Sequence, residues 1–291
     1  MDLIRDAGEL RSRTDAARAG GGDVGLVPTM GALHEGHMSL IRRARDRNAT
    51  LVVSIFVNPM QFADPADLEG YPRDEERDLA LCDAEGVDVV WAPALEQVYP
   101  TGVELPQPDP GPVGRTFEGA SRRGHFEGVL AVVHRLFDVN GPCSAYFGEK
   151  DAQQLFLIRR MVAAEALPVE VVGCPTVRTS DGLALSSRNA RLSQDERERA
   201  TCLFLALTEA AALSRRGERD PKVLVATMAR EIGATPLVRL DHAAVVSDLD
   251  FAPVDRLDGA VPVRALVAAR IASARLSDNL LLPRPARAPA A

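Results

Sequence analysis

A continuous run of apolar, mostly β-branched residues constrains the fold of this chain more than any other feature. The run, Leu51–Val57 (LVVSIFV), shows no alternation of apolar and polar residues, which is typical of a strand buried on both faces. A strand of this kind is covered by a layer of helices on either side. Helical spacing of apolar residues flanks it at 37–47 and 75–85. The chain is therefore predicted to begin as an α/β protein.

The same alternation continues along the first 175 residues. Further apolar runs that indicate strands lie at 25–29, 87–91, 145–148 and 169–174, and helical spacing returns at 129–137 and 151–166. Strands that alternate with helices pair in parallel through right-handed crossovers, so we expect a doubly wound parallel sheet over residues 1–175. The stretch 99–128 interrupts this order, because it is rich in Pro and Gly with little periodicity. It is predicted to be a linker or a functional lid.

The pattern changes after Pro175. We expect two helices, at 195–215 and 221–232, followed by strands or mixed elements at 238–247, 260–269 and 273–282. Residues 176–282 are therefore predicted to form a smaller α+β domain. The last residues, 283–291 (PRPARAPAA), have the composition of a disordered tail.

Composition excludes several classes of protein. The 291 residues carry a net charge of −7 and contain no Lys/Arg-rich block, which argues against a nucleic-acid partner. The four cysteines include no CxxC pair, so a zinc ribbon or a redox dithiol is not expected. The longest uncharged stretch, 48–63, is too short and too polar to span a membrane, and MDLIRDAGEL lacks the apolar core of a signal peptide. A cytoplasmic protein is expected.

The sharpest local motif is MGALHEGH, Met30–His37, which lies where a strand is expected to end and a helix to begin. Ligands of open α/β sheets bind at that edge, and a helix N-terminus favours phosphate. His34 and His37 are three residues apart, so in a helical turn both imidazoles project to the same side. The zinc-protease motif HExxH is absent, because Met38 follows His34 by four residues. Phosphate binding and a structural role in capping the turn both remain open.

Three other turns carry polar groups to the same edge. In FGEKD, Lys150 is one of only two lysines in the chain, although a solvated charge cluster is an alternative explanation. In LSSRN, Ser186, Ser187 and Arg188 suit the outer phosphates of a nucleotide, and the alternative is an N-cap region for the helix that follows. In SIFVNPMQF, Asn58 and Gln61 suit a small hydroxylated or carboxylated substrate, but an Asn-Pro turn explains Asn58 equally well.

Taken together, these segments resemble the pantothenate synthetase family. The segments that carry the resemblance are VPTMGALHEGHMSLI, SIFVNPMQF, YPRDEERD, GHFEGV, YFGEKDAQQL and DGLALSSRN, with ARIASARLSDNLLL near the C-terminus. The resemblance covers roughly residues 1–282 and is weak between Asp195 and Asp241. Any one of these motifs occurs in other nucleotidyl-transfer proteins, whereas the ordered series is specific to the family.

The resemblance implies an ATP-dependent ligase that joins pantoate to β-alanine through a pantoyl adenylate and releases AMP and pyrophosphate. It also implies a Rossmann-like N-terminal domain, a smaller C-terminal lid domain, Mg²⁺ accompanying ATP, and a homodimer. His37, His34, Lys150 and Arg188 would be catalytic, Gln61 and Gln154 would bind pantoate, and Gln61 would also approach β-alanine. The ATP site would comprise Met30, Gly31, Ala32, Leu33, His34, Glu35, Gly36, His37, Gly148, Glu149, Lys150, Asp151, Val177, Leu185, Ser186, Ser187 and Arg188.

The sequence departs from the family pattern at Arg123, where a proline is common, and at Thr179, where an acidic residue is frequent. No residue is an obvious base for the β-alanine amine. Three alternative functions are a plain nucleotidyltransferase, a tRNA-charging enzyme and a catalytically inactive binding module. The paired glutamines argue against the first, the acidic composition against the second, and the intact His34, His37, Lys150 and Arg188 against the third.

Overall fold

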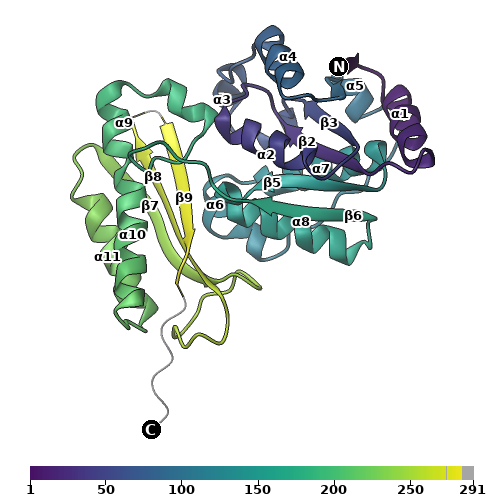
Figure 1. Ribbon diagram of the computed structural model, residues 1–291. Coiled ribbons are helices and arrows are strands. Elements are labelled where there is room, and N and C mark those ends of the chain that lie inside the picture. The colour runs from purple at the N-terminus through teal and green to yellow at the C-terminus, as the bar shows by residue number, and fades with distance from the viewer. Residues whose placement is uncertain (273, 284–291) are drawn as a thin grey trace. The chain divides into compact units, whose positions relative to one another are not determined.

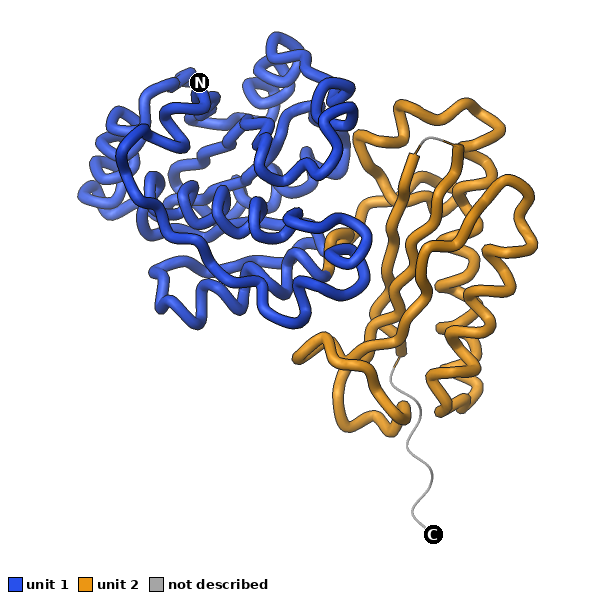
Figure 2. Tube along the Cα trace, turned by 180° about the vertical axis from the view of Figure 1, so that it is seen from behind, with its two compact units in different colours: residues 1–149, 153–175 blue, residues 150–152, 176–291 orange. Residues whose placement is uncertain are grey.

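The computed structural model describes residues 1–272 and 274–283 and divides the chain into two compact units (Figures 1 and 2). The N-terminal unit contains Met1–Glu149 and Gln153–Pro175. The C-terminal unit contains the short piece Lys150–Ala152 and the chain from Thr176 onward. Apart from Pro283, the tail predicted at 283–291 lies outside the described residues.

The N-terminal unit is a six-stranded sheet whose strand order is β1-β4-β3-β2-β5-β6 (Figure 1). Every neighbouring pair of strands is parallel, which confirms the predicted doubly wound α/β class. The strands are β1 Asp2–Ile4, β2 Val24–Thr29, β3 Thr50–Ile55, β4 Val89–Trp91, β5 Cys143–Gly148 and β6 Val169–Cys174. The main helices are α1 Ala7–Ala19, α2 Glu35–Arg45, α4 Glu75–Ala84, α7 His125–Asn140 and α8 Ala152–Ala164. The sequence analysis did not predict β1 or α1.

The sheet is buried on both faces because successive strand residues enter two different cores. In β2, Leu26 packs with residues of α7 and α8, whereas Val27 packs with residues of α2 and α4. In β3, Val52 belongs to the first core and Val53 to the second. This alternation is the period of two that a strand imposes on its side chains. It explains why the run at 51–57 is apolar at every position except Ser54, which is also buried.

The direction of winding reverses between β2 and β5, which are adjacent in the sheet although β3 and β4 lie between them in the sequence. Ligands of doubly wound sheets bind at the carboxyl ends of the strands beside such a switch point. Here β2 ends at Thr29 and β5 ends at Gly148. The MGALHEGH and GEKD turns therefore begin at the two strands that form the switch point.

The Pro/Gly-rich stretch predicted at 99–128 contains more regular structure than expected. It includes the 3-10 turn η2 Val113–Arg115, the short helix α6 Phe117–Ser121 and the first turn of α7, which begins at His125. Further short elements before it are η1 Pro59–Gln61, α3 Pro65–Glu69 and α5 Leu95–Val98.

The C-terminal unit packs three helices on a three-stranded antiparallel sheet of order β7-β8-β9 (Figure 2). Its elements are η4 Ser187–Arg191, α9 Gln194–Ala200, α10 Cys202–Arg215, α11 Pro221–Gly233, β7 Val238–Ser247, β8 Val263–Ile271 and β9 Ala274–Leu281. The turn η3 Glu149–Asp151 is divided between the units, because Glu149 belongs to the N-terminal unit and the other two residues belong to the C-terminal unit. The single helix predicted at 195–215 is wrong, because the structure has two helices there, with Thr201 between them. No helix of the described chain is long and apolar enough to cross a membrane.

The packing of α7 against η1 generates a test of the fold. A Cβ added at Gly128 would lie 2.3 Å from the Met60 carbonyl oxygen, so only glycine lets this helix approach that backbone. We expect Gly128→Ala to lower the free energy of unfolding by about 1–3 kcal/mol, as overpacking typically does. Gly233→Ala is the matched control, since an added Cβ there meets no atom within 4 Å. Urea denaturation measures both, and equal stabilities of the two variants would contradict this account of Gly128.

Candidate active site

His34 and His37 begin α2 by capping each other's backbone. His34 is the N-cap residue, and its Nδ1 accepts a hydrogen bond from the Gly36 N–H at 3.1 Å. The Nδ1 of His37 accepts from the His34 N–H at 3.3 Å, and the two ring centroids are 4.1 Å apart. The arrangement is a capping box in which imidazoles replace the usual hydroxyl and carboxylate. The two histidines therefore have the structural role in capping the turn that the sequence analysis left open.

This capping fixes the chemistry of both rings. An imidazole nitrogen that accepts a hydrogen bond carries no proton, so the proton of each neutral ring is on Nε2. Each ring thus uses Nδ1 for the fold and presents an Nε2–H donor at the N-terminus of α2, where the helix dipole favours an anion. Capping and phosphate binding are compatible in this turn, because they use different atoms of the same two side chains.

The residues just before His34 are held by Asp78, a buried carboxylate of α4. Its two oxygens accept from the Ala32 and Leu33 N–H groups, each at 2.8 Å. Gly31 and Ala32 both have positive φ, and a Cβ at Gly31 would lie 2.9 Å from an Asp78 oxygen. Burial raises the pKa of Asp78, and the two backbone hydrogen bonds partly offset that rise. The two backbone N–H groups are therefore committed to the protein, which leaves nucleotide contacts to other groups of this loop.

The sequence analysis quoted Asp78 within YPRDEERD but assigned it no role. A signal was present, because Asp78 lies four residues before the buried Cys82 and so falls on the apolar face of α4. A carboxylate on such a face indicates a buried partner. Its partners are 45 and 46 residues away, and no local pattern identifies them.

Asn58 is a structural residue, as the Asn-Pro turn alternative proposed. Its Oδ1 accepts from the Met60 N–H and from the Tyr99 hydroxyl, while its Nδ2 donates to the Gly128 carbonyl at 2.9 Å. The side chain is 1% exposed. These contacts join η1 to α7, and they use the amide that the sequence analysis offered to a substrate.

The structure brings Gln61 to the MGALHEGH loop. The Gln61 Nε2 donates to the Met30 sulfur at 2.8 Å, and its Oε1 accepts from Asn58 at 3.3 Å. His125, from the GHFEGV segment, bonds through Nδ1 to the Gln61 carbonyl at 2.8 Å. Two of the predicted substrate residues, Met30 and Gln61, therefore lie in direct contact.

Gln153 and Gln154 are adjacent on α8 but differ in their surroundings. Gln153 is buried and holds the η2–α6 segment, donating to the carbonyls of Val113 and Thr116 and accepting from the Glu118 N–H. Gln154 is half-buried, and its side-chain amide makes no hydrogen bond to another described residue. Its assignment to pantoate stays a prediction.

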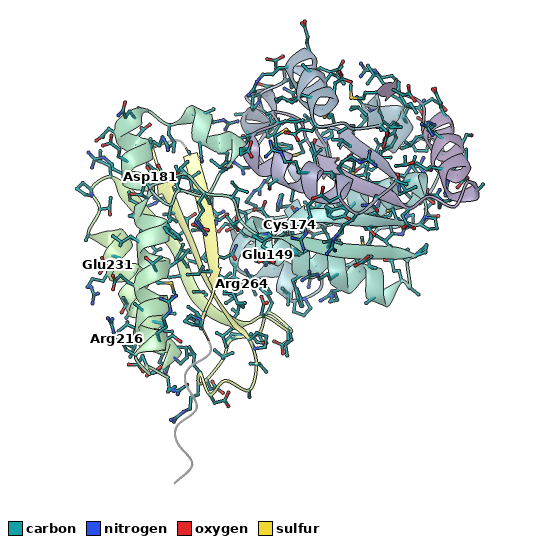
Figure 3. All side chains as sticks on the ribbon, in the orientation of Figure 1. Glu149, Cys174, Asp181, Arg216, Glu231 and Arg264 are labelled. Carbon is teal, nitrogen blue, oxygen red and sulfur yellow. The ribbon has the colours of Figure 1, made fainter. Side chains whose placement is uncertain are left out.

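Gly148 ends β5 and pairs with Cys174 at the end of β6, and Glu149, which begins η3, also belongs to the N-terminal unit (Figure 3). The remaining predicted nucleotide residues belong to the C-terminal unit, where Lys150 forms an ion pair with Asp151 at 3.4 Å. The Leu185 N–H donates to the Val177 carbonyl at 3.0 Å, which joins the two sides of that loop. That His34 and His37 surround one triphosphate together with Lys150 and Arg188 stays a prediction.

The SSRN motif is itself a cap. Ser186 is the N-cap of η4, and its Oγ accepts from the Arg188 N–H at 3.2 Å. As the alternative to phosphate binding, the sequence analysis offered an N-cap for the helix that follows. In the structure Ser186 instead caps the short turn η4, which contains Arg188. Nearby, the Thr179 hydroxyl bonds to Asp181, so this departure from the family pattern is absorbed within the loop.

Comparisons with known proteins agree along the whole chain. The profile of the family described as pantoate-beta-alanine ligase matches residues 2–281. A pantothenate synthetase of Roseiflexus castenholzii is 50% identical over 97% of this chain and 99% of that protein. A crystal structure of pantothenate synthetase from Thermus thermophilus has a TM-score of 0.90 at 44% identity, covering 97% of this chain and 100% of that one. The ligase of Francisella tularensis, solved with β-γ ATP and β-alanine, has a TM-score of 0.77 at 31% identity and covers 97% of both chains.

The contact of Asp78 with the loop predicts a measurable role. In Asp78→Asn one carboxylate oxygen becomes an NH₂ group that faces a backbone N–H, so we expect a loss of about 1–3 kcal/mol in unfolding free energy. The Ala32 and Leu33 amides should also lose protection from hydrogen exchange. Asp74→Ala is the control, because it removes only the N-cap of the same helix and leaves the loop contacts intact. Unchanged protection of both amides in Asp78→Asn would show that the carboxylate does not hold the loop.

Proposed function

This chain belongs to the pantoate-beta-alanine ligase family, and from that membership we propose how its residues perform the reaction. The enzyme condenses pantoate with β-alanine at the expense of ATP and forms pantothenate, AMP and pyrophosphate. The observation that carries the assignment is the family match over residues 2–281, with the double-histidine turn at the switch point of the sheet. Supplying ATP and pantoate with and without β-alanine tests it: continuous pyrophosphate release with no AMP release, whether or not β-alanine is present, would instead indicate a plain nucleotidyltransferase that keeps AMP on its product.

In the first step a pantoate carboxylate oxygen attacks the α-phosphorus, pyrophosphate leaves and a pantoyl adenylate forms. Negative charge builds on the phosphate oxygens, and donors already aimed at them stabilise it. We assign this role to the Nε2–H groups of His34 and His37, to the Lys150 ammonium and to the Arg188 guanidinium. We also assign to His37 the protonation of the departing pyrophosphate. The capping box supports the assignment, because it holds both rings before any ligand binds.

Mg²⁺ is proposed to enter with ATP as part of the substrate. Within the described residues no group of three or more His, Cys, Asp or Glu side chains could hold a metal ion. This fits an ion that phosphate oxygens and water carry in, which is how Mg²⁺ is commonly bound beside nucleotides. When bound, it neutralises charge on the phosphates.

In the second step the neutral amine of β-alanine attacks the acyl carbon of the adenylate, and AMP leaves. The adenylate is hydrolysable, so water must be excluded. Gln153 fixes Val113–Glu118 against α8, which argues against that part of the 99–128 stretch as the moving lid. We therefore assign closure to the C-terminal unit. Gln61 and Gln154 hold pantoate, and Gln61 also approaches β-alanine.

The family resemblance supports two further proposals about the assembly and its location. The enzyme is a homodimer, which light scattering coupled to size-exclusion chromatography tests. The second proposal is that the enzyme works in the cytoplasm.

The chain's two lysines provide a matched test of the first step. We expect Lys150→Ala to lower the rate of pyrophosphate release by about 10²–10³-fold, the usual cost of losing one such donor. Lys222, in the first turn of α11, is exposed, and Lys222→Ala should leave the rate unchanged. Pyrophosphate release near the wild-type rate in Lys150→Ala would contradict the role given to that ammonium.

His34 needs a variant that separates its two roles. Asn is a favoured N-cap residue, so His34→Asn retains a side-chain acceptor for the Gly36 N–H but removes the Nε2–H donor. We expect normal thermal stability with a fall of about 10²-fold in pyrophosphate release. A variant that is both stable and fully active would restrict His34 to capping.

The adjacent glutamines of α8 test the pantoate site. Gln154→Ala is expected to raise KM for pantoate at least tenfold, by about 1.4 kcal/mol of lost binding, with little change in KM for ATP. Gln153→Ala is the comparison, and it should lower stability because it removes the three hydrogen bonds that hold Val113, Thr116 and Glu118 against α8. Equal losses for pantoate and ATP in Gln154→Ala would remove that residue from the acid site.

A further inference from the structure

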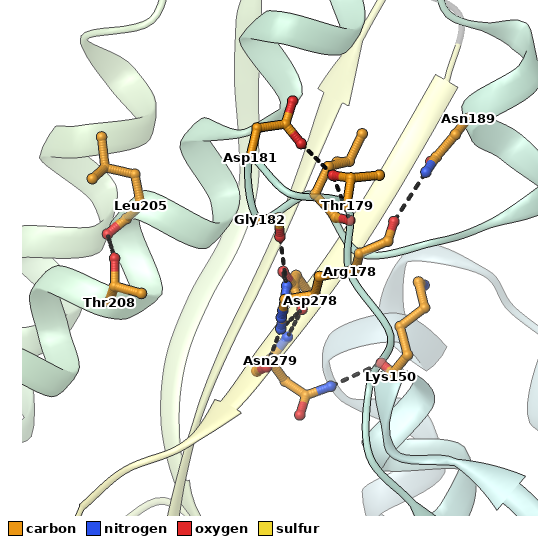
Figure 4. A network of polar contacts seen from close by, with 12 residues as sticks. Lys150, Arg178, Thr179, Asp181, Gly182, Asn189, Leu205, Thr208, Asp278 and Asn279 are labelled. Carbon is orange, nitrogen blue, oxygen red and sulfur yellow. Dashed lines mark hydrogen bonds and ion pairs between the residues drawn. The ribbon is translucent and has the colours of Figure 1, made fainter. Parts of the chain in front are cut away.

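The main chain at Lys150 is held by a residue 129 positions later. Asn279, on β9, donates through Nδ2 to the Lys150 carbonyl at 2.8 Å (Figure 4). Asn279 is 5% exposed and lies in the segment ARIASARLSDNLLL, to which the proposed reaction assigns no part. Lys150–Ala152 group with the C-terminal unit, although β5 before them and most of α8 after them belong to the N-terminal unit.

The orientation of the Asn279 amide is determined by its other partner. Its Oδ1 accepts from the Arg264 Nη1 at 2.6 Å, and a guanidinium can only donate. The NH₂ group must therefore face Lys150. Arg264 is itself buried and fixed by Asp248, with 2.6 Å between Nε and Oδ1. The contact to Lys150 thus rests on a chain of charge-assisted hydrogen bonds, which are stronger than neutral ones.

The preceding residue, Asp278, holds the other nucleotide segment of the same unit. Its carboxylate binds Arg178 through two bonds of 2.5 and 2.8 Å, and Arg178 also donates to the Gly182 carbonyl (Figure 4). Gly182 lies in the loop that leads to Arg188. Two consecutive residues of β9 therefore anchor the main chain at Lys150 and the loop before Arg188.

We infer that Asn279 is a positioning residue for adenylate formation, which acts by fixing the main chain from which the Lys150 side chain extends. The inference rests on the role proposed above for Lys150. A lysine side chain is long and flexible, so the protein can direct its ammonium only by setting the backbone and packing the stem. Misplacement of a reacting group by about 1 Å can cost about 10²-fold in rate.

The test is Asn279→Asp. The new carboxylate keeps the acceptor for Arg264, removes the donor to the Lys150 carbonyl and adds a negative charge. We expect pyrophosphate release from ATP and pantoate to fall by about 10- to 100-fold. KM for pantoate should stay within about twofold, because the loss falls on the transition state rather than on binding of the acid.

A double-mutant cycle with Lys150→Ala shows whether Asn279 acts through Lys150. In single turnovers with enzyme in excess, Asn279→Asp should lower the residual rate of Lys150→Ala by less than about threefold. The same factor in both backgrounds would overturn the inference. Wild-type activity of Asn279→Asp beside an impaired Lys150→Ala would also overturn it and leave the role of Lys150 standing. An active Lys150→Ala would overturn the proposed role of Lys150 instead.

Two further variants separate positioning from stability. Asn279→Ala removes both hydrogen bonds without adding a charge, so the same kinetic loss is expected there even if the aspartate variant does not fold. Asn48→Asp is the matched control, since Asn48 is a buried asparagine of the N-terminal unit that donates to the Ala44 carbonyl and the Tyr146 hydroxyl. It should lower Tm and leave turnover unchanged. A kinetic loss in Asn48→Asp equal to that of the Asn279 variants would overturn the inference.

Discussion

The parallel pairing of β2 with both β3 and β5 is the constraint on which the rest of the N-terminal unit depends. It aligns the carboxyl ends of three strands at one edge of the sheet and reverses the direction of winding there. The double-histidine turn, the Asn58–Gln61 turn and the GEKD turn each begin where one of these strands ends. Turns that are far apart in the sequence therefore carry their polar groups to a single edge.

At that edge, the atoms that maintain the turn are separate from the atoms to which we assign ligand binding. The imidazoles of His34 and His37 use Nδ1 for the backbone, which leaves the proton on Nε2. Asp78 occupies two consecutive N–H groups that would otherwise form an anion site. The side chains of Asn58 and Gln153 form hydrogen bonds that maintain the fold. Asn58 contacts Gln61, and Gln153 is adjacent to Gln154, which are the two glutamines assigned to substrate. The donors are thus held in place before substrate arrives.

In the C-terminal unit, buried charged and polar side chains hold the main chain in a similar way. Asp278 and Asn279 are buried, and each is paired with an arginine, so the cost of burying charge is met by hydrogen bonds of good geometry. Replacing a whole buried pair, both partners together, with well-packed hydrocarbon side chains is often neutral for stability. Asp278 and Asn279 instead fix the course of the main chain. They hold the backbone at Lys150 and the loop that leads to Arg188, and both of these residues are assigned to the nucleotide.

The sequence by itself determined every strand except β1, most of the main helices, the fold class and the turns that carry chemistry, because periodicity and motif order are local properties. It did not show that Thr201 separates α9 from α10, nor which of Gln153 and Gln154 is committed to the fold. The main-chain groups that Asp78 and Asn279 bind lie 45 to 129 residues away. Only the tertiary structure decided those pairs, because they depend on how strands and helices pack against one another, which no short stretch of sequence records.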